Sequence, residues 1–392
     1  MIQIIIGIIV GVCLGIFTGL SPGIHVNLIS VLMFSVSAYL LKIVDPLILG
    51  IVIVSMAITH TFLDIIPSIF LGVPDDEEAI AALPSHRMLL QGNAFEAVQL
   101  STIGALGGLI IAILLIPIFL IFTEHLYAFL ESSIALLLIL TAGFMIFNEK
   151  NKLWALIIFL ISGVLGIIVF AIPVNEPLFP LFSGLFGISM LVNSIIENVK
   201  IPEQKFHDVE VKGVGKAIFT SVIMGWIASF MPGIGTAQVA AISAKIVKLE
   251  ENAFIILVGG LSTVNMLLSL VSLYLLEKAR NGAVVVVMKL LEVEQREFFI
   301  LSFSCLIAGG IATIITLKLA RLFTKFIGTI NYKKLCLGVL LVIFILVAII
   351  SGWLGILILI ISTFLGLLTE LKQITKSQMM GCLIIPVIIY FI

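Results

Sequence analysis

The sequence predicts an all-α polytopic membrane protein, with about ten to twelve membrane helices arranged in two related halves. Of its 392 residues, 61% are hydrophobic and only 11% are charged, and the mean hydropathy is +1.32. A soluble domain carries about 25% charged residues. Long apolar runs recur from end to end. Because these runs are continuous, rather than alternating over segments of ~10 residues, the spans are expected to be helices and not the strands of a barrel.

The same composition excludes several classes of protein. A soluble globular enzyme and a disordered chain both need far more charged or polar residues. The net charge of −1 provides no basic face for a phosphate backbone, so no nucleic-acid partner is expected. The cysteines lie in apolar stretches without metal-ligand spacing, so we expect no disulfide framework, metal or other cofactor. The apolar start, Met1–Leu20, lacks a basic region and is expected to be the first membrane element rather than a signal peptide.

Apolar segments and one polar connection organise the chain. The polar connection, 197–216, is expected to be a cytoplasmic linker between a first membrane repeat, 1–196, and a second, 217–392. Short segments beside Pro-Gly pairs are interpreted as half-helices. The apolar segments lie at 2–20, 24–41, 46–73, 98–123, 132–148, 153–172, 181–196, 217–231, 234–247, 253–276, 298–323, 335–351, 353–369 and 379–392.

Each half opens with the same pattern, at a constant offset of 210 residues. A second and weaker match follows, in which Thr61-x2-Asp64-x3-Ser68 resembles Thr263-x-Asn265-x3-Ser269. Together these matches predict an internal duplication, which is typical of transporters. The opening patterns are Gly15-x3-Gly19-x2-Pro22-Gly23-Ile24 and Gly225-x3-Ser229-x2-Pro232-Gly233-Ile234.

The positions of Lys and Arg predict how the halves are oriented. No basic residue precedes the first Pro-Gly pair, whereas four lysines between 200 and 216 precede the second. By the positive-inside rule the linker is cytoplasmic, so the second pair is entered from the cytoplasm and the first from outside. This is an inverted-topology repeat. The stretches Lys278–Arg296 and Lys318–Lys334 are expected to be further basic loops.

The two Pro-Gly pairs predict an anion-binding site near the bilayer midplane. Proline and glycine interrupt a helix, and freed backbone groups inside hydrocarbon need protein or a water-filled cavity. A helix that restarts after each break presents free N–H groups and a positive dipole end to an anion. Simple kinks for helix packing are the alternative. The candidate binding residues are Ser21, Pro22, Gly23, His25, Asn27, Pro232, Gly233, Gly235 and Thr236, with Gln238 nearby.

A coupling-ion site is predicted beside the first break. Asp64 lies in a strongly apolar span, where an ionisable residue is costly and usually functional. It is expected to carry H⁺ or to bind Na⁺ with Thr61 and His60. Asn265, with Thr263, occupies the related place in the second half and carries no charge. A hydrogen-bonded helix contact is the alternative role for Asp64.

An acidic run at 75–78 follows Pro74. One interpretation is that these acids stabilise the first turn of a helix, with Asp75 as its N-cap. The other is a cation site or a cytoplasm-facing gate, in which Arg87 closes on Asp75 and Asp76, on an anionic substrate or on a lipid headgroup.

These motifs resemble the TctA family, the large permease subunit of tripartite tricarboxylate transporters, and in particular its archaeal relatives. The resemblance covers most of 7–108 and 217–291 and implies an ion-driven permease for carboxylate anions in the cytoplasmic membrane. Val73-Pro74-Asp75 stands where the family has Pro-Gly, so a tricarboxylate substrate and a separate binding protein both stay open. The motifs are GLSPGIHVN at 19–27, SFMPGIGTA at 229–237, and Pro67-Ser68-x3-Gly72-x-Pro74 followed by Arg87-Met88-x2-Gln91-Gly92-x-Ala94.

Three functions are weighed. The first is a secondary transporter for a small organic anion. The second is a flippase for a lipid-linked phosphate such as polyprenyl phosphate, which the low polarity of the chain favours. The third is an intramembrane enzyme, because His60 and Asp64 share a helix face; no HExxH or GxSxG motif supports it, and no enzyme is expected. Membrane lipids are expected neighbours. Gly104-x2-Gly107-Gly108 leaves a homodimer contact or internal packing open.

Overall fold

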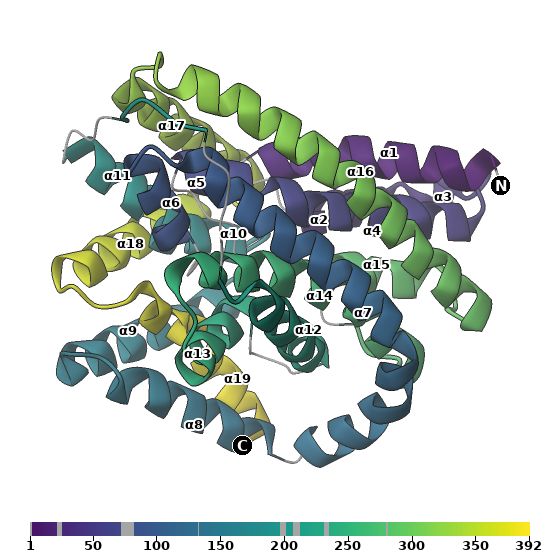
Figure 1. Cartoon of the computed structure of the whole chain (residues 1–392). Helices are drawn as coiled ribbons and strands as arrows, with labels where there is room; N and C mark the ends of the chain where they lie inside the picture. Colours follow the sequence, from purple (N-terminus) through teal and green to yellow (C-terminus); the bar gives the residue numbers. More distant parts are fainter. Residues whose placement is uncertain are drawn as a thin grey trace.

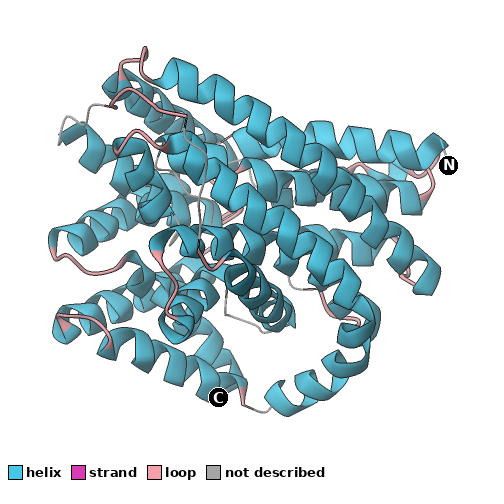
Figure 2. Cartoon of the chain, in the orientation of Figure 1, coloured by secondary structure: helices cyan, strands magenta, loops and turns pink. Residues whose placement is uncertain are grey.

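The structure is a computed structural model, which describes residues 2–21, 26–71, 82–131, 133–196, 201–206, 212–230, 235–279 and 281–392. All regular structure within these ranges is helical (Figure 2), which confirms the predicted all-α class. Nine helical segments among the described residues are long and apolar enough to cross a membrane, and three shorter apolar helices accompany them. The chain is a multi-pass integral membrane protein.

The helices fall into two series with the same order (Figure 1). The first series is α1 (Ile2–Leu20), α2 (Val26–Ser35), α3 (Ser37–Leu40), α4 (Pro46–Leu63), α5 (Ile65–Leu71), α6 (Ala82–Leu90), α7 (Ala94–Glu131), α8 (Ile134–Phe147), α9 (Lys152–Ala171), α10 (Leu178–Phe182), the π-helix η1 (Ser183–Ile188) and α11 (Ser189–Ile196). The second is α12 (Val214–Phe230), α13 (Thr236–Val247), α14 (Glu251–Leu276), α15 (Gly282–Leu290), α16 (Gln295–Ile327), α17 (Tyr332–Ile350), α18 (Gly352–Leu371), the 3₁₀-helix η2 (Lys376–Met380) and α19 (Gly381–Phe391).

Local sequence determines where several helices begin. Asp45 caps α4 by accepting a hydrogen bond of 2.9 Å from the N–H of Leu47, and Pro46 occupies the first turn, where its missing donor costs nothing. Asn281 caps α15 in the same way, accepting from the N–H of Val284 at 2.8 Å. These caps fix the starts of α4 and α15.

Helix α1 packs on α4 through glycines spaced four residues apart, at positions 7, 11, 15 and 19. A methyl group added at Gly15 would lie only 2.6 Å from the carbonyl oxygen of Met56. Backbones approach this closely only where no side chain stands between them. The backbone of α1 therefore lies directly against α4, which is almost wholly buried.

Helix α12 packs on α14 in the corresponding way. Ser221, Gly225 and Ser229 stand 210 residues after three of the α1 glycines, and a methyl group at Gly225 would lie 2.8 Å from Cγ1 of Val264. Helix α7 packs on the same α14, where Gly104 contacts Ile256 and a methyl group at Gly108 would meet Gly260. The glycine face of α7 therefore packs inside the chain, and this resolves the alternative between a homodimer contact and internal packing.

The C-terminal parts of the two series pack crosswise. Helix α9 of the first series lies against α19 of the second, and Figure 1 shows both beside α8 at the lower left. Helix α18 of the second series lies against η1 of the first. The contacts match at offsets of 200 and 197 residues, which indicates a reciprocal exchange between two similar units. They join Gly166 to Cys382 and Gly381 to Ser162, and likewise Gly366 to Leu185 and Gly184 to Ser362.

Two stretches expected to be basic loops are largely helical. Helix α15 lies inside 278–296, and α16 continues to Ile327, so Lys318, Arg321 and Lys325 lie on its last turns. The helix continues beyond the apolar pattern. Its last turns can carry lysine and arginine because long cationic side chains can lie along an apolar surface. The Arg321 guanidinium lies over the Phe95 ring, 5.4 Å from its centroid.

Candidate functional site

Helix boundaries coincide with both predicted breaks. Helix α1 ends at Leu20 and α2 begins at Val26, while α12 ends at Phe230 and α13 begins at Thr236. Several predicted site residues lie outside the described residues, so their roles in anion binding or gating stay predictions. They are Pro22, Gly23, His25, Asp75, Asp76, Pro232 and Gly233.

The other predicted anion-binding residues lie at the edges of these breaks. Ser21 follows α1 and is half-buried, as is Gly235 before α13. Thr236, the first residue of α13, is buried. Asn27, in the first turn of α2, packs on the start of α15, where a methyl group at Gly282 would lie 2.8 Å from its Oδ1. The first turn of α2 is thus held against the second half of the chain.

Asp64 lies at the boundary between α4 and α5, which the sequence analysis did not predict, within one continuous apolar span, Pro46–Leu71. Its N–H donates to the His60 carbonyl at 2.9 Å, and the Ser68 N–H donates to the Asp64 carbonyl at 3.2 Å. His60, Asp64 and Ser68 are all buried. Because they are four residues apart on a helical path, their side chains share one face.

That face meets the end of α1, just before the first break. The Nδ1 of His60 lies 3.1 Å from the Thr18 hydroxyl. A methyl group at Gly19 would lie 3.3 Å from the backbone nitrogen of Asp64. The predicted ion-coupling residues His60 and Asp64 therefore pack against Thr18 and Gly19, which precede Ser21 by two or three residues.

The two halves meet at a pair of threonines. The Thr61 and Thr263 hydroxyl oxygens are 3.0 Å apart, and both side chains are buried. Each hydroxyl can also donate to a carbonyl of its own helix, Thr61 to Ile58 at 2.9 Å and Thr263 to Gly259 at 3.3 Å, so either hydroxyl can be the donor between them. The sequence paired these residues as repeats of one another, and the structure places them in contact where α4 crosses α14.

Packing shifts the correspondence between α4 and α14 by three residues from the one that the motif suggested. Gly15 of α1 faces Thr59, and Gly225 of α12 faces Val264. In this register His60 corresponds to Asn265, and Asp64 corresponds to Ser269, whose hydroxyl donates to the Asn265 carbonyl at 2.7 Å. The carboxylate of the first half is therefore matched by a neutral hydroxyl in the second.

Several hydroxyl groups near Asp64 lack partners. Ser55, Thr59 and Ser68 are buried, and their oxygens have no hydrogen-bond partner among the described residues. Serine and threonine in helices usually donate to the carbonyl four residues before them, as Thr102 does at 2.7 Å. Hydroxyl oxygens that lack such a bond can serve as oxygen ligands for a small hard cation.

Arg87, the predicted gate residue, makes an ion pair across the two halves. Its Nη1 lies 3.1 Å from Oε1 of Glu251, in the first turn of α14. Both side chains are more than half exposed, so the pair contributes little to stability. Glu251 is the ion-pair partner of Arg87 among the described residues.

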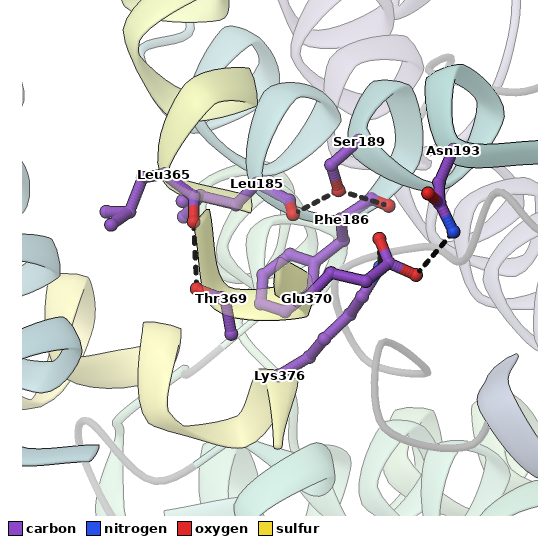
Figure 3. A network of polar contacts seen from close by, with 8 residues as sticks. All are labelled: Leu185, Phe186, Ser189, Asn193, Leu365, Thr369, Glu370 and Lys376. Carbon is purple, nitrogen blue, oxygen red and sulfur yellow. Dashed lines mark hydrogen bonds and ion pairs between the residues drawn. The ribbon is translucent and has the colours of Figure 1, made fainter. Parts of the chain in front are cut away.

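A second polar cluster, absent from the sequence-based predictions, joins α11, α18 and η2 (Figure 3). Lys376 is buried, and its Nζ lies 4.0 Å from Oε2 of Glu370. The other carboxylate oxygen of Glu370 accepts a hydrogen bond of 3.1 Å from Asn193. The sequence signal was weak, because Lys376 stands at a polar edge next to the last apolar segment.

His86 lies close to this cluster. It is buried in α6, with Nδ1 2.7 Å from the Ile69 carbonyl, and its ring stacks on that of Tyr332. Burial lowers the pKa of His86 below its usual 6.5; the hydrogen bond to Ile69 opposes that effect, and the charge of Lys376 adds to it. Nδ1 therefore donates to Ile69, and a neutral imidazole keeps Nε2 as an acceptor.

An apolar pocket of about 220 Å³ adjoins the end of α1. Leu20, the residue before Ser21, is one of its walls. Its remaining lining comes from α5, α16 and the start of α17, namely Ile66, Pro67, Phe70, Leu71, Leu322, Phe323, Phe326, Ile327, Ile330 and Leu335. Within the described part of the chain, no group of three or more His, Cys, Asp or Glu side chains gathers as a metal site would require.

Comparison with known proteins identifies one family. The family described as "Tripartite tricarboxylate transporter TctA family" matches residues 5–381. An uncharacterized protein of Methanocaldococcus jannaschii, MJ1079, is 34% identical over 390 residues, which cover 95% of this chain and 94% of that protein. No solved structure matches.

Proposed function

Because this chain belongs to the tripartite tricarboxylate transporter TctA family, we propose that it is a secondary active permease for a small carboxylate anion, coupled to H⁺ or Na⁺. The family is one of transporters rather than enzymes, and its members work with the other subunits of a tripartite system. Its integral membrane character agrees with the nine apolar spans of the described residues. Substrate, coupling ion and binding residues are the proposed details.

The substrate is proposed to bind between the restarting helices α2 and α13. The observation that supports this site is the pair of helix ends at matching positions, Leu20 and Phe230, each followed by a Pro-Gly pair. N–H groups and a positive dipole end at each restart would hold carboxylate oxygens. The binding residues are proposed to be Ser21, Pro22, Gly23, His25, Asn27, Pro232, Gly233, Gly235 and Thr236.

Ion coupling is proposed to depend on Asp64. The observation that carries this proposal is a buried carboxylate on the face that meets the end of α1, beside the first break. The Ser68 hydroxyl, which has no hydrogen-bond partner among the described residues, lies about one turn after Asp64 and would add an oxygen ligand to a cation site. The Thr59 hydroxyl, also without such a partner, lies five residues before Asp64. Thr61, His60 and Asn265 are the further candidates, at the crossing of α4 and α14.

Alternating access is proposed to move one half of the chain against the other. The repeated order of helices supports two units of similar structure, and so does the crosswise packing of α9 with α19 and of α18 with η1. An inverted orientation of these units would expose the substrate site to each side in turn.

Reconstitution of the purified chain into liposomes tests this proposal. The expected result is uptake of radiolabelled citrate or succinate that requires an inward H⁺ or Na⁺ gradient and that stops when an ionophore dissipates it. Absence of uptake for mono-, di- and tricarboxylates under both gradients, in the presence of the partner subunits of the system, would contradict it.

One observation favours a second candidate, a flippase for a lipid-linked phosphate. The apolar pocket beside Leu20 adjoins the first break, so a lipid tail could lie there while its phosphate meets the start of α2. The same liposomes, loaded with a fluorescent polyprenyl phosphate, distinguish the two functions. Movement of that lipid between leaflets without carboxylate uptake would replace the first proposal with the second.

A further inference from the structure

Lys376 is a buried cation with unused hydrogen-bond donors. Its side chain is only 4% exposed, and Nζ makes no hydrogen bond with the described residues. The ammonium group has three donors, and leaving them unmade away from water is costly. Its ion-pair partner among the described residues is Oε2 of Glu370, at 4.0 Å, a distance too long for a hydrogen bond.

Glu370 stands between this cation and the edge of the cluster. Its Oε1 is held by Asn193 of α11, and its side chain is about one-third exposed. Figure 3 shows Lys376 reaching from η2 toward the carboxylate, with Asn193 on the other side. The carboxylate is therefore restrained by α11 and is also accessible, whereas the ammonium is enclosed.

The cluster contacts one of the two helices between which the substrate is proposed to bind. Helix η2, which begins with Lys376, contacts α13, the helix that restarts after the second Pro-Gly pair. The described charged or titratable groups around Nζ are Glu370 of α18 and His86 of α6, and burial keeps His86 neutral. Lys376 can thus supply a formal positive charge, which the two helix ends lack.

We propose that the Lys376 ammonium binds a carboxylate group of the transported anion, and that Glu370 occupies this position when no anion is bound. This inference rests on the proposed function and adds a charged contact to it. An incoming carboxylate would satisfy the unused donors of Lys376 at shorter distance, and Glu370 would remain bound to Asn193. Glu370 then acts as an internal competitor that keeps affinity low enough for release.

Binding of radiolabelled citrate to the full-length purified chain tests the inference, with succinate as a smaller probe. Lys376→Met should weaken binding at least about tenfold, which corresponds to the loss of a charge-assisted hydrogen bond. Lys376→Arg should retain most of the affinity. Glu370→Gln should bind several-fold more tightly, because the competing charge is gone while the amide can still contact Asn193.

The double variant, Lys376→Met with Glu370→Gln, separates a binding role from a structural one. It contains no unpaired buried charge, so it should remain monodisperse and melt near the wild-type temperature. We expect it to bind citrate as weakly as Lys376→Met alone. Wild-type affinity in this variant, or weaker binding in a folded Glu370→Gln variant, would overturn the inference while the carboxylate permease still stands. A wild-type chain that binds neither citrate nor succinate would overturn both.

Discussion

Two pairs of helices, α1 with α4 and α12 with α14, occupy the same places in the two halves and differ in chemistry. On α4, His60 and Asp64 face the end of α1, whereas the packing register puts Asn265 and Ser269 at the corresponding places on α14. Helices α4 and α14 are buried to a similar degree. The comparison shows that two helix pairs with similar packing can differ in chemistry, with His60 and Asp64 on one pair and neutral side chains at the corresponding places on the other.

The two helix pairs also differ in how closely their backbones approach. Glycine occupies all four contact positions of α1, but serine replaces it at two of the matching positions of α12. A methyl group at Gly15 would lie 2.5 Å from Cβ of Thr59 and 2.6 Å from a backbone oxygen of α4, whereas one at Gly225 would lie 2.8 Å from the Val264 side chain and 3.5 Å from the backbone nitrogen of Asn265. The half with the candidate ion site therefore has the tighter helix contact, which holds His60 close to Thr18.

The largest expected effect comes from removing the carboxylate that distinguishes the halves. Asp64→Asn should reduce gradient-driven citrate uptake to the level of empty liposomes, because the amide carries no charge to bind Na⁺ or a proton. Ser269→Ala, at the corresponding place in α14, is the matched control and should retain most of the uptake. Equal losses in the two variants, or normal coupled uptake in Asp64→Asn, would remove the proposed asymmetry.

A stability measurement tests whether α1 packs more tightly on α4 than α12 does on α14. Gly15→Ala should destabilise the protein by about 1–3 kcal/mol, since the carbonyl of Met56 cannot move away without shifting a helix. Gly225→Ala should cost less, because the Val264 side chain has some freedom to shift. Thermal melting in detergent measures both. Equal shifts would show that the two contacts are equally tight.

A smaller effect is expected where the halves meet. Thr61→Val and Thr263→Val should show a coupling free energy of about 0.6 kcal/mol in a double-mutant cycle, the usual magnitude for a hydrogen bond between membrane helices. Serine at either position retains the hydroxyl and serves as the control. Purely additive effects would mean that the 3.0 Å contact does not join the halves.

The smallest expected effect is a pH dependence from His86. Its folded-state pKa lies below 6.5, so the unfolded chain binds more protons as the pH falls through 6.5 and stability decreases with acidification. His86→Gln should make the melting temperature fall less between about pH 6.5 and 5. A wild-type melting temperature that rises over this interval would contradict the burial of a neutral imidazole.

The sequence predicted the features that depend on local pattern. Apolar runs gave the α1 boundaries, and the Pro-Gly pairs marked the ends of α1 and α12. It also indicated Asp64 as the ionisable residue of a buried span. Each of these follows from neighbours within a few turns, because helix breaking and hydrophobic periodicity are local properties.

The remaining features depend on contacts between distant residues. Lys376 lies between the apolar segments 353–369 and 379–392 and was not singled out, and only the fold brings it, through Glu370, to Asn193 of the other half. The threonine contact between α4 and α14 was likewise hidden, since the motif aligned its residues as equivalents and gave no sign that they touch. The helix boundary at Asp64, by contrast, has a local cause, because Pro67 has no N–H to donate to the Leu63 carbonyl.

Protection of introduced cysteines tests most directly the claim that both breaks bind one anion. In a background without the four native cysteines, Ser21→Cys and Gly235→Cys are labelled in membrane vesicles with an impermeant maleimide, with and without citrate. The account predicts that the two positions are reached from opposite sides and that citrate slows labelling at both. Labelling from the same side, or protection at only one position, would contradict it.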